Sequence, residues 1–150
     1  MNYWLIKTEP TSYSIDDLKR DKKTSWTGIR NYQVRNLIRD EIKKGDLCLF
    51  YHSSAEPAGV YGVAKVISSA KPDPTALDRK DSHFDPKATK ANPIWMCMGV
   101  AFVSKAKNPF ALLEIKADHA LDGMLVRKQG SRLSVQPVSK AHFLHIQKHL

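Results

Sequence analysis

Apolar residues in this chain occur in short runs, and these runs limit the folds that are open to it. The runs "YWLIKT", "DLCLFYH", "GVYGVAKVIS" and "IWMCMGVAFVSKA" have the lengths of strands and are separated by turn residues. Between the first two runs, Val34, Leu37, Ile38 and Ile42 form one apolar stripe at helical spacing, with Gly45 as a natural stop. Strands mixed with short amphipathic helices predict an α+β fold: a curled mixed sheet or small barrel of about six strands, flanked by helices.

The length of 150 residues suits one domain with its own core, and no repeat or linker divides residues 1–150. No apolar run approaches the length of a membrane span, and the chain does not open with a basic-then-apolar signal segment. We therefore expect a cytoplasmic protein that does not enter a membrane. Cys48 and Cys97 lie inside apolar runs, where buried free thiols are expected. No apolar stripe is left over to require a partner, so we expect a monomer.

The charge of the chain narrows its possible partners. Its 24 Lys and Arg residues exceed its 15 Asp and Glu residues, which gives a formal net charge of +9. Such an excess favours polyanions, because the release of counterions from phosphates contributes affinity without regard to sequence. A charge spread evenly over the surface for solubility explains the same number equally well. Charge alone therefore leaves both interpretations open.

The segment that follows the first predicted helix contains an aromatic residue and an amide in unusual places. Trp26 stands in a polar turn beside Gly28. Its indole can form one wall of a site for a nucleobase, or it can be a rim residue that packs on a helix end. Asn31 is placed first of all to cap the second helix, although its amide can also bind the edge of a base.

Further polar side chains lie where predicted strands end. Lys7 and Thr8 end the first strand, and His52 and Ser53 end a later one. Side chains in such places often face a cleft, but simple exposure to solvent is the more common outcome. The run "QGSRLSVQP" adds Arg132, which can bind a phosphate or form part of an ordinary turn. Ser131 and Ser134 lie in the same run, which we expect to complete any pocket.

Motifs for catalysis and metal binding are weak in this sequence. It contains no nucleophile elbow, phosphate-binding loop, zinc-protease motif or zinc-deaminase motif. The loop acids Asp73, Asp78, Asp81 and Asp85 are typical of a solvated segment. His142, His145 and His149 have helical spacing, but no Cys or carboxylate stands out as a further ligand. We therefore expect solvated histidines, no metal and no cofactor.

Several long motifs together resemble the EVE domain family. They are "YWLIKTEPTSYSIDDL", "WTGIRNYQVRN", "GDLCLFYHS", "GVYGVAKV", "FDPK", "NPIWM" and "LVRKQGSRLSVQPV", which extend over essentially the whole chain. The resemblance implies a PUA-like fold similar to that of YTH domains, which bind methylated adenine in RNA. One departure is that Trp26-Thr27-Gly28 stands where bacterial EVE proteins usually have Trp-Asp-Gly. The loss of that carboxylate bears on which base is bound.

The resemblance implies a protein that binds nucleic acid, DNA or RNA, and receives one flipped, modified base without catalysis. Methylated or hydroxymethylated bases are the expected targets. On this hypothesis Trp26 stacks on the base, and Arg30, Arg35 and Arg132 contact phosphates. The base edge is surrounded by Lys7, Thr8, Asn31, His52, Ser53 and Ser134. Two alternatives stay open: a PUA-like module that binds RNA regardless of modification, and a weak nuclease or base-processing hydrolase with His52 as its general base.

Overall fold

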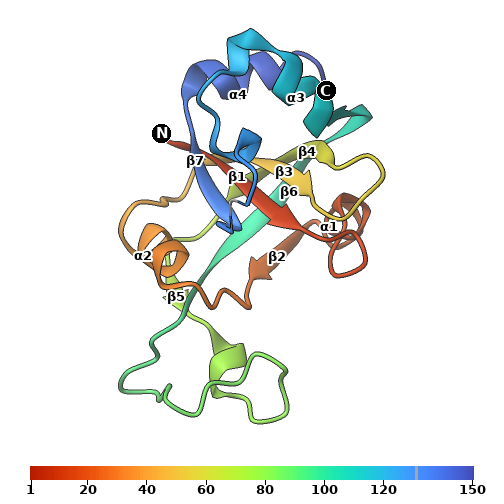
Figure 1. Ribbon diagram of the computed structural model, residues 1–150. Coiled ribbons are helices and arrows are strands. Elements are labelled where there is room, and N and C mark those ends of the chain that lie inside the picture. Colours follow the sequence, from red (N-terminus) through yellow and green to blue (C-terminus); the bar gives the residue numbers. More distant parts are fainter. Residues whose placement is uncertain (131) are drawn as a thin grey trace.

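A mixed β-sheet forms the centre of the molecule and helices pack against it (Figure 1). The computed structural model describes residues 1–130 and 132–150, so Ser131 lies outside the described residues. Within them the sheet has seven strands. They are β1 (Tyr3–Thr8), β2 (Lys23–Trp26), β3 (Leu47–His52), β4 (Gly59–Val66), β5 (Lys71–Pro72), β6 (Met96–Ala111) and β7 (Val135–Val138).

Helices occupy the connections between the strands. The α-helices are α1 (Ile15–Asp21), α2 (Tyr32–Asp40), α3 (Leu112–Ala117) and α4 (Lys140–Gln147), and the 3₁₀ turns are η1 (Pro74–Leu77), η2 (His119–Leu121) and η3 (Leu125–Arg127). Helix α1 begins with the capping box expected of "SIDDL", in which Ser14 and Asp17 each bond the other's main-chain N–H. None of the described helices has the length and apolar character needed to cross a membrane.

The strand order explains which chain segments meet at one edge of the sheet. Strands run in the order β2-β6-β4-β3-β1-β7, and β5 pairs with β6. β1 and β3 are parallel, so their last residues, Thr8 and His52, lie opposite each other. β7 is antiparallel to β1, with Val135 opposite Ile6. The ends of β1 and β3 and the entry to β7 therefore meet at one edge.

The expectation of a small barrel is wrong, whereas the α+β class is confirmed. β2 and β7 are the two end strands, and no pairing among the described residues joins them, so the sheet is open. The sheet also has one strand more than the six or so expected. β2 and β5, "KTSW" and "KP", are short and polar and therefore lack the apolar run by which a strand is recognised in sequence.

Alternation along the strands divides the core between the two faces of the sheet. In β1, Trp4 and Ile6 belong to a first cluster that includes residues of α1 and α2. Leu5 belongs to a second cluster, which includes residues of α3 and α4. Because successive side chains of a strand point to opposite faces, one apolar strand can contribute to both cores. Cys48 and Cys97 are fully buried and are not joined in a disulfide, as expected.

Candidate nucleic-acid interface

A cavity of about 370 Å³ opens at the edge where β1 ends. That volume lies within the range of roughly 300–1,000 Å³ that is typical of ligand pockets. Its walls come from the end of β1, the loop before α1, strand β2 with its following turn, and the loop 73–95. The lining residues are Thr8, Ser12, Tyr13, Thr24, Ser25, Trp26, Thr27 and His83.

Two aromatic rings meet at the base of this cavity. The ring centres of Trp26 and Tyr13 are 6.2 Å apart and their planes nearly perpendicular, and the ring centre of Phe50 lies 5.6 Å from that of Trp26. Trp26 is only 8% exposed and belongs to the first core. The sequence suggested an uncovered indole in a turn, but β2 extends through Trp26 and places this residue opposite Met98 of β6. The indole is therefore both a core side chain and a cavity wall.

The hydroxyl of Tyr13 is fixed at the outer end of its ring. It donates a hydrogen bond to Asp21 Oδ2 at 2.8 Å. Partial burial, followed by this hydrogen bond, raises the pKa of Tyr13 to about 12, so the phenol stays protonated at neutral pH. The cavity accordingly offers neutral aromatic surface together with the hydroxyls of serine and threonine residues. Flat apolar walls with a few polar groups suit a nucleobase, because a base has a π face and a hydrogen-bonding edge.

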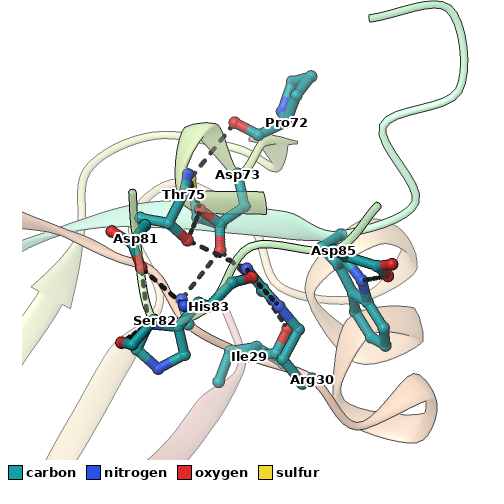
Figure 2. Close-up of polar contacts among 12 residues, drawn as sticks. Ile29, Arg30, Pro72, Asp73, Thr75, Asp81, Ser82, His83 and Asp85 are labelled. Atoms are coloured by element: carbon teal, nitrogen blue, oxygen red, sulfur yellow. Dashed lines mark hydrogen bonds and ion pairs between the residues drawn. The ribbon is translucent and has the colours of Figure 1, made fainter. Parts of the chain in front are cut away.

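The loop 73–95 supplies the outer wall, and Asp73 anchors it (Figure 2). The Asp73 side chain is completely buried and accepts hydrogen bonds from Gly28 N, Thr75 N and Oγ1, and Arg30 Nη1. Burial alone would raise the pKa of Asp73, but the hydrogen bonds from Thr75 and Gly28 outweigh burial and lower this pKa. The expectation that Asp73 is a solvated loop acid is therefore wrong.

His83 completes the wall beside the turn that follows β2. Its main-chain oxygen accepts two hydrogen bonds from the Arg30 guanidinium, as Figure 2 shows. Its ring lies against Gly28, where a Cβ atom would be 3.0 Å from His83 Nε2. Gly28 has a φ of +84°, a conformation that favours glycine. This glycine therefore allows both the turn and the close approach of the imidazole.

His52 is buried and is not among the residues that line the cavity. The ring is 2% exposed, and Nε2 accepts a hydrogen bond from Ile15 N at 3.3 Å. Nδ1 is therefore the protonated nitrogen, and it donates to Thr8 O at 3.1 Å. Both ring nitrogens are thus engaged with the main chain, which corrects the expected contact with a base edge. His52 instead holds the two ends of the loop that carries Ser12 and Tyr13.

The other strand-end residues lie around the same edge, and of Lys7, Thr8, Ser53 and Ser134 only Thr8 is in the cavity wall. Thr8 lines the cavity, whereas Lys7 points to the opposite face, where its Nζ lies 5.8 Å from the Tyr51 ring centre. Lys7 was expected beside Thr8 in one pocket, and strand alternation separates them. Ser134 O accepts from Lys7 N at 2.8 Å, and Ser53 N donates to Thr8 O at 3.2 Å. These serines support the edge through their main chains.

Three residues expected at the base or its phosphates have structural contacts elsewhere. Asn31 Oδ1 caps α2 by accepting from Val34 N, and Asn31 does not line the cavity. Arg30 is directed to Asp73, Thr75 and His83 O, so its guanidinium joins the loop to the domain. Arg35 donates to Ile94 O at the far end of that loop. Arg132 is exposed near the entry to β7.

Sequence reasoning missed most of the cavity lining. Tyr13 lies in "YWLIKTEPTSYSIDDL", one of the motifs that resemble the EVE domain family, and this motif was the available signal for it. His83 carries no such signal, because only the folding of loop 73–95 onto Gly28 brings it to the cavity. The cavity is also lined by ordinary polar residues that no sequence motif singles out, namely Ser12, Thr24, Ser25 and Thr27.

Comparison with known proteins now places the chain in a family. The model of the EVE domain matches residues 2–149. This chain is an EVE domain protein of the thymocyte nuclear protein 1 family. It is 39% identical to the chicken thymocyte nuclear protein 1 over 94% of its length and 37% identical to the human protein over 95%. The chain spans 65% of the length of the chicken protein and 71% of the human one.

Solved structures of EVE relatives agree with the fold described above. A Pseudomonas syringae protein is 41% identical, with a TM-score of 0.92 and 97% of each chain covered. The human THYN1 protein, solved in complex with DNA containing 5-methylcytosine, is 33% identical with a TM-score of 0.90, covering 99% of this chain and 96% of that one. An ASCH protein from Zymomonas mobilis, 9% identical with a TM-score of 0.56, shares the fold alone.

Proposed function

We propose that this EVE domain protein is a non-enzymatic reader of DNA, which binds a methylated or hydroxymethylated base extruded into the cavity lined by Trp26, Tyr13 and His83. The observation that carries the proposal is the likeness, over nearly the whole chain, to a human relative solved with DNA that contains 5-methylcytosine. The cavity supports it with aromatic surface and hydroxyls on a chain of net charge +9. Stacking of a base on an aromatic side chain contributes roughly 1–3 kcal/mol.

The contacts of His52 favour a reader over a hydrolase. A general base must accept a proton from water or substrate through a nitrogen that they can reach. His52 Nε2 instead accepts the Ile15 main-chain N–H, and Nδ1 donates to Thr8 O. The residue to which the hydrolase hypothesis assigned catalysis is thus part of the scaffold.

The proposal is tested by a binding panel at one stated salt concentration. Oligonucleotides of DNA and RNA, single-stranded and duplex, carry 5-methylcytosine, 5-hydroxymethylcytosine, N6-methyladenine or no modification. We expect at least a tenfold preference for one modified DNA strand. His83→Ala should reduce that preference several-fold, because it removes one cavity wall while its ring is half exposed and dispensable for the core.

Two further variants make the panel decisive. Trp26→Phe keeps apolar volume in the core but reduces the aromatic wall, and it should also weaken the preference. His119→Ala is the matched control, because the His119 side chain is 96% exposed and does not line this cavity. Equal binding to modified and plain strands contradicts the proposal. RNA binding that ignores modification supports the PUA-like module instead.

A further inference from the structure

Three metal-ligating side chains converge on the side of the molecule where α3 and α4 lie. Asp118 directly follows α3, His145 is in the last turn of α4, and His149 lies just beyond that helix. Their potential ligand atoms all lie within 4.8 Å of one another. The helical spacing of the two histidines is visible in the sequence, but their carboxylate partner is not, because Asp118 precedes His145 by 27 residues. Only the packing of α4 beside η2 brings Asp118 next to His145.

The carboxylate is held in an orientation that presents one oxygen to the histidines. Asp118 Oδ1 accepts a hydrogen bond from Ala120 N at 3.0 Å, which fixes the side chain. Oδ2 is 2.7 Å from His145 Nε2. Hydrogen bonds to a metal-ligating side chain fix its orientation, and their loss typically lowers metal affinity about 10–100-fold.

The second histidine is supported by an aromatic ring. His149 stacks on Phe110, with ring centres 5.1 Å apart and planes inclined by 24°. Its ring centre also lies 5.1 Å from that of His145. His149 is exposed, whereas Asp118 and His145 are partly buried. The cluster therefore has two well-positioned donors and one that is able to move.

Two imidazoles and one carboxylate form a donor set that zinc accepts. Around a tetrahedral zinc ion with bonds of about 2.1 Å, neighbouring ligand atoms are about 3.4 Å apart. The 2.7 Å between Asp118 Oδ2 and His145 Nε2 must therefore widen slightly, and the other separations, which reach at most 4.8 Å, must shorten through a rotation of the exposed His149. The surface beside Asp118 and His149 is a shallow, open depression, which leaves room for water as the fourth ligand.

We propose that Asp118, His145 and His149 form a binding site for Zn²⁺. The ion binds neutral imidazoles and an ionised carboxylate, so it replaces the His145–Asp118 hydrogen bond, and any proton that the histidines carry passes to solvent. Bound zinc joins α4 to the α3–η2 segment over the second core, which contains Phe143, Ile146 and Ile115. Figure 1 shows α3 and α4 at the opposite end of the molecule from loop 73–95. The site is therefore separate from the cavity of the proposed reader.

The test is a titration of the metal-free, untagged full chain with ZnCl₂, monitored by calorimetry. Thermal unfolding is then measured with and without zinc. We expect a stoichiometry of one. At a free zinc concentration of about 100 times Kd, the melting temperature should rise by about 5–10 °C. His149→Gln and Asp118→Asn should each weaken binding at least tenfold. His149→Gln is the more informative variant, since His149 is exposed and its replacement leaves the buried core intact.

His142→Gln is the matched control, because His142 is on the same helix but outside the cluster. This variant should keep the wild-type affinity. Co²⁺ in place of zinc should give the visible absorption of a four-coordinate site, and His149→Gln should abolish it. Binding that survives both ligand variants, or no stoichiometric binding at all, overturns the proposal and leaves the Asp118–His145 contact as a hydrogen bond only. DNA binding with and without zinc should be the same, so this result is independent of the reader proposal.

Discussion

The imidazole of His52 lies between main-chain groups of two segments, Thr8 at the end of β1 and Ile15 at the start of α1. The neutral imidazole satisfies both main-chain groups, because Nε2 accepts a hydrogen bond from Ile15 N and Nδ1 donates one to Thr8 O. A second proton would turn Nε2 into a donor facing the Ile15 N–H. Burial, the largest influence, also lowers the pKa of His52. The residue is therefore a pH-sensitive support for the loop that carries Tyr13.

The sign of the pH effect follows from that lowered pKa. Below the unfolded-state pKa of about 6.5, the unfolded chain gains a proton that the folded chain does not accept until lower pH. The stabilising contribution of His52 is thus complete above pH 6.5 and is lost as the pH falls from there towards the lowered folded-state pKa. We expect His52→Gln to reduce the free energy of unfolding by about 1–3 kcal/mol at pH 7.5, the cost of an unsatisfied buried group.

At lower pH, the free energy of unfolding of His52→Gln should differ less from that of the wild type. Below pH 6.5 this difference in the free energy of unfolding should shrink by at most about 1.4 kcal/mol per pH unit, because His52 of the unfolded wild type takes up one proton whereas glutamine does not titrate. Urea unfolding of both proteins between pH 7.5 and 5 measures this difference, and the other histidines cancel in the comparison. A difference that stays constant across this range would contradict the role assigned to His52.

The burial of the Trp26 indole determines how the protein responds to its substitution. For an indole in an exposed turn, Trp26→Ala would remove base discrimination and leave the fold intact. Because the indole is 8% exposed and packs on Phe50, its truncation to alanine should instead cost about 3–5 kcal/mol of stability. Trp26→Phe reduces this cost and is the better probe of stacking.

At the scale of elements, loop 73–95 and the turn after β2 form one unit. Asp73 binds Gly28 N and Arg30, and the Arg30 guanidinium returns to His83 O. Arg30 also lies 5.4 Å from the centre of the Trp95 ring, whose Nε1 donates to Asp85. These contacts order a long loop whose composition suggested only solvated acids. The cavity owes its outer wall to this unit.

Gly28→Ala should disrupt the unit at its closest point. An alanine at φ +84° is strained, and its Cβ would lie 3.0 Å from His83 Nε2. We expect a loss of about 1–3 kcal/mol in the free energy of unfolding, with weaker preference for modified DNA because His83 is displaced. Chemical denaturation and the binding panel measure the two effects.

A double variant separates the strain from the clash. In the background of His83→Ala, Gly28→Ala should cost measurably less stability than it costs alone, because the ring that it meets is gone. The loss of stability that remains in this background is due to the strain of the positive φ. Strictly additive losses would show that the His83 ring does not press on this turn.

The whole molecule carries a net charge of +9, which should make any binding to DNA strongly dependent on salt. Each phosphate contact contributes about −0.9 to the slope of log K against log[salt] for duplex DNA. Of the arginines expected at phosphates, Arg30 and Arg35 are bonded to loop 73–95, and Arg132 is exposed near the entry to β7. Of these three arginines, Arg132 is therefore the one that we expect to meet a phosphate.

Arg132→Ala should make that slope shallower by about 0.9 while leaving the preference for a modified base unchanged. The physical reason is that one counterion fewer is released, whereas the cavity is not altered. Affinity measured from 50 to 200 mM NaCl gives the slope. Arg39→Ala is the control, because Arg39 pairs with Asp40 on the surface of α2. An unchanged slope for Arg132→Ala would remove this residue from the phosphate contacts.

The sequence by itself determined the elements whose cause is local. Apolar runs specify β1, β3 and β4, the Ser14–Asp17 capping box specifies the start of α1, and the apolar stripe specifies α2. Long motifs specify the EVE family and through it the type of fold. Trp26 and Thr8 line the same cavity, as expected, although the binding of a base there remains a prediction.

Only the tertiary structure decided which of the remaining side chains meet. The open sheet, the opposite directions of Lys7 and Thr8, and the burial of His52 depend on strand pairing and alternation. His83 reaches the cavity, and Asp118 reaches His145, across loops and helices whose packing no local pattern encodes. Local propensities fix the elements, because they act between neighbours in the chain. Sites form between elements, so their composition depends on the packing of the whole molecule.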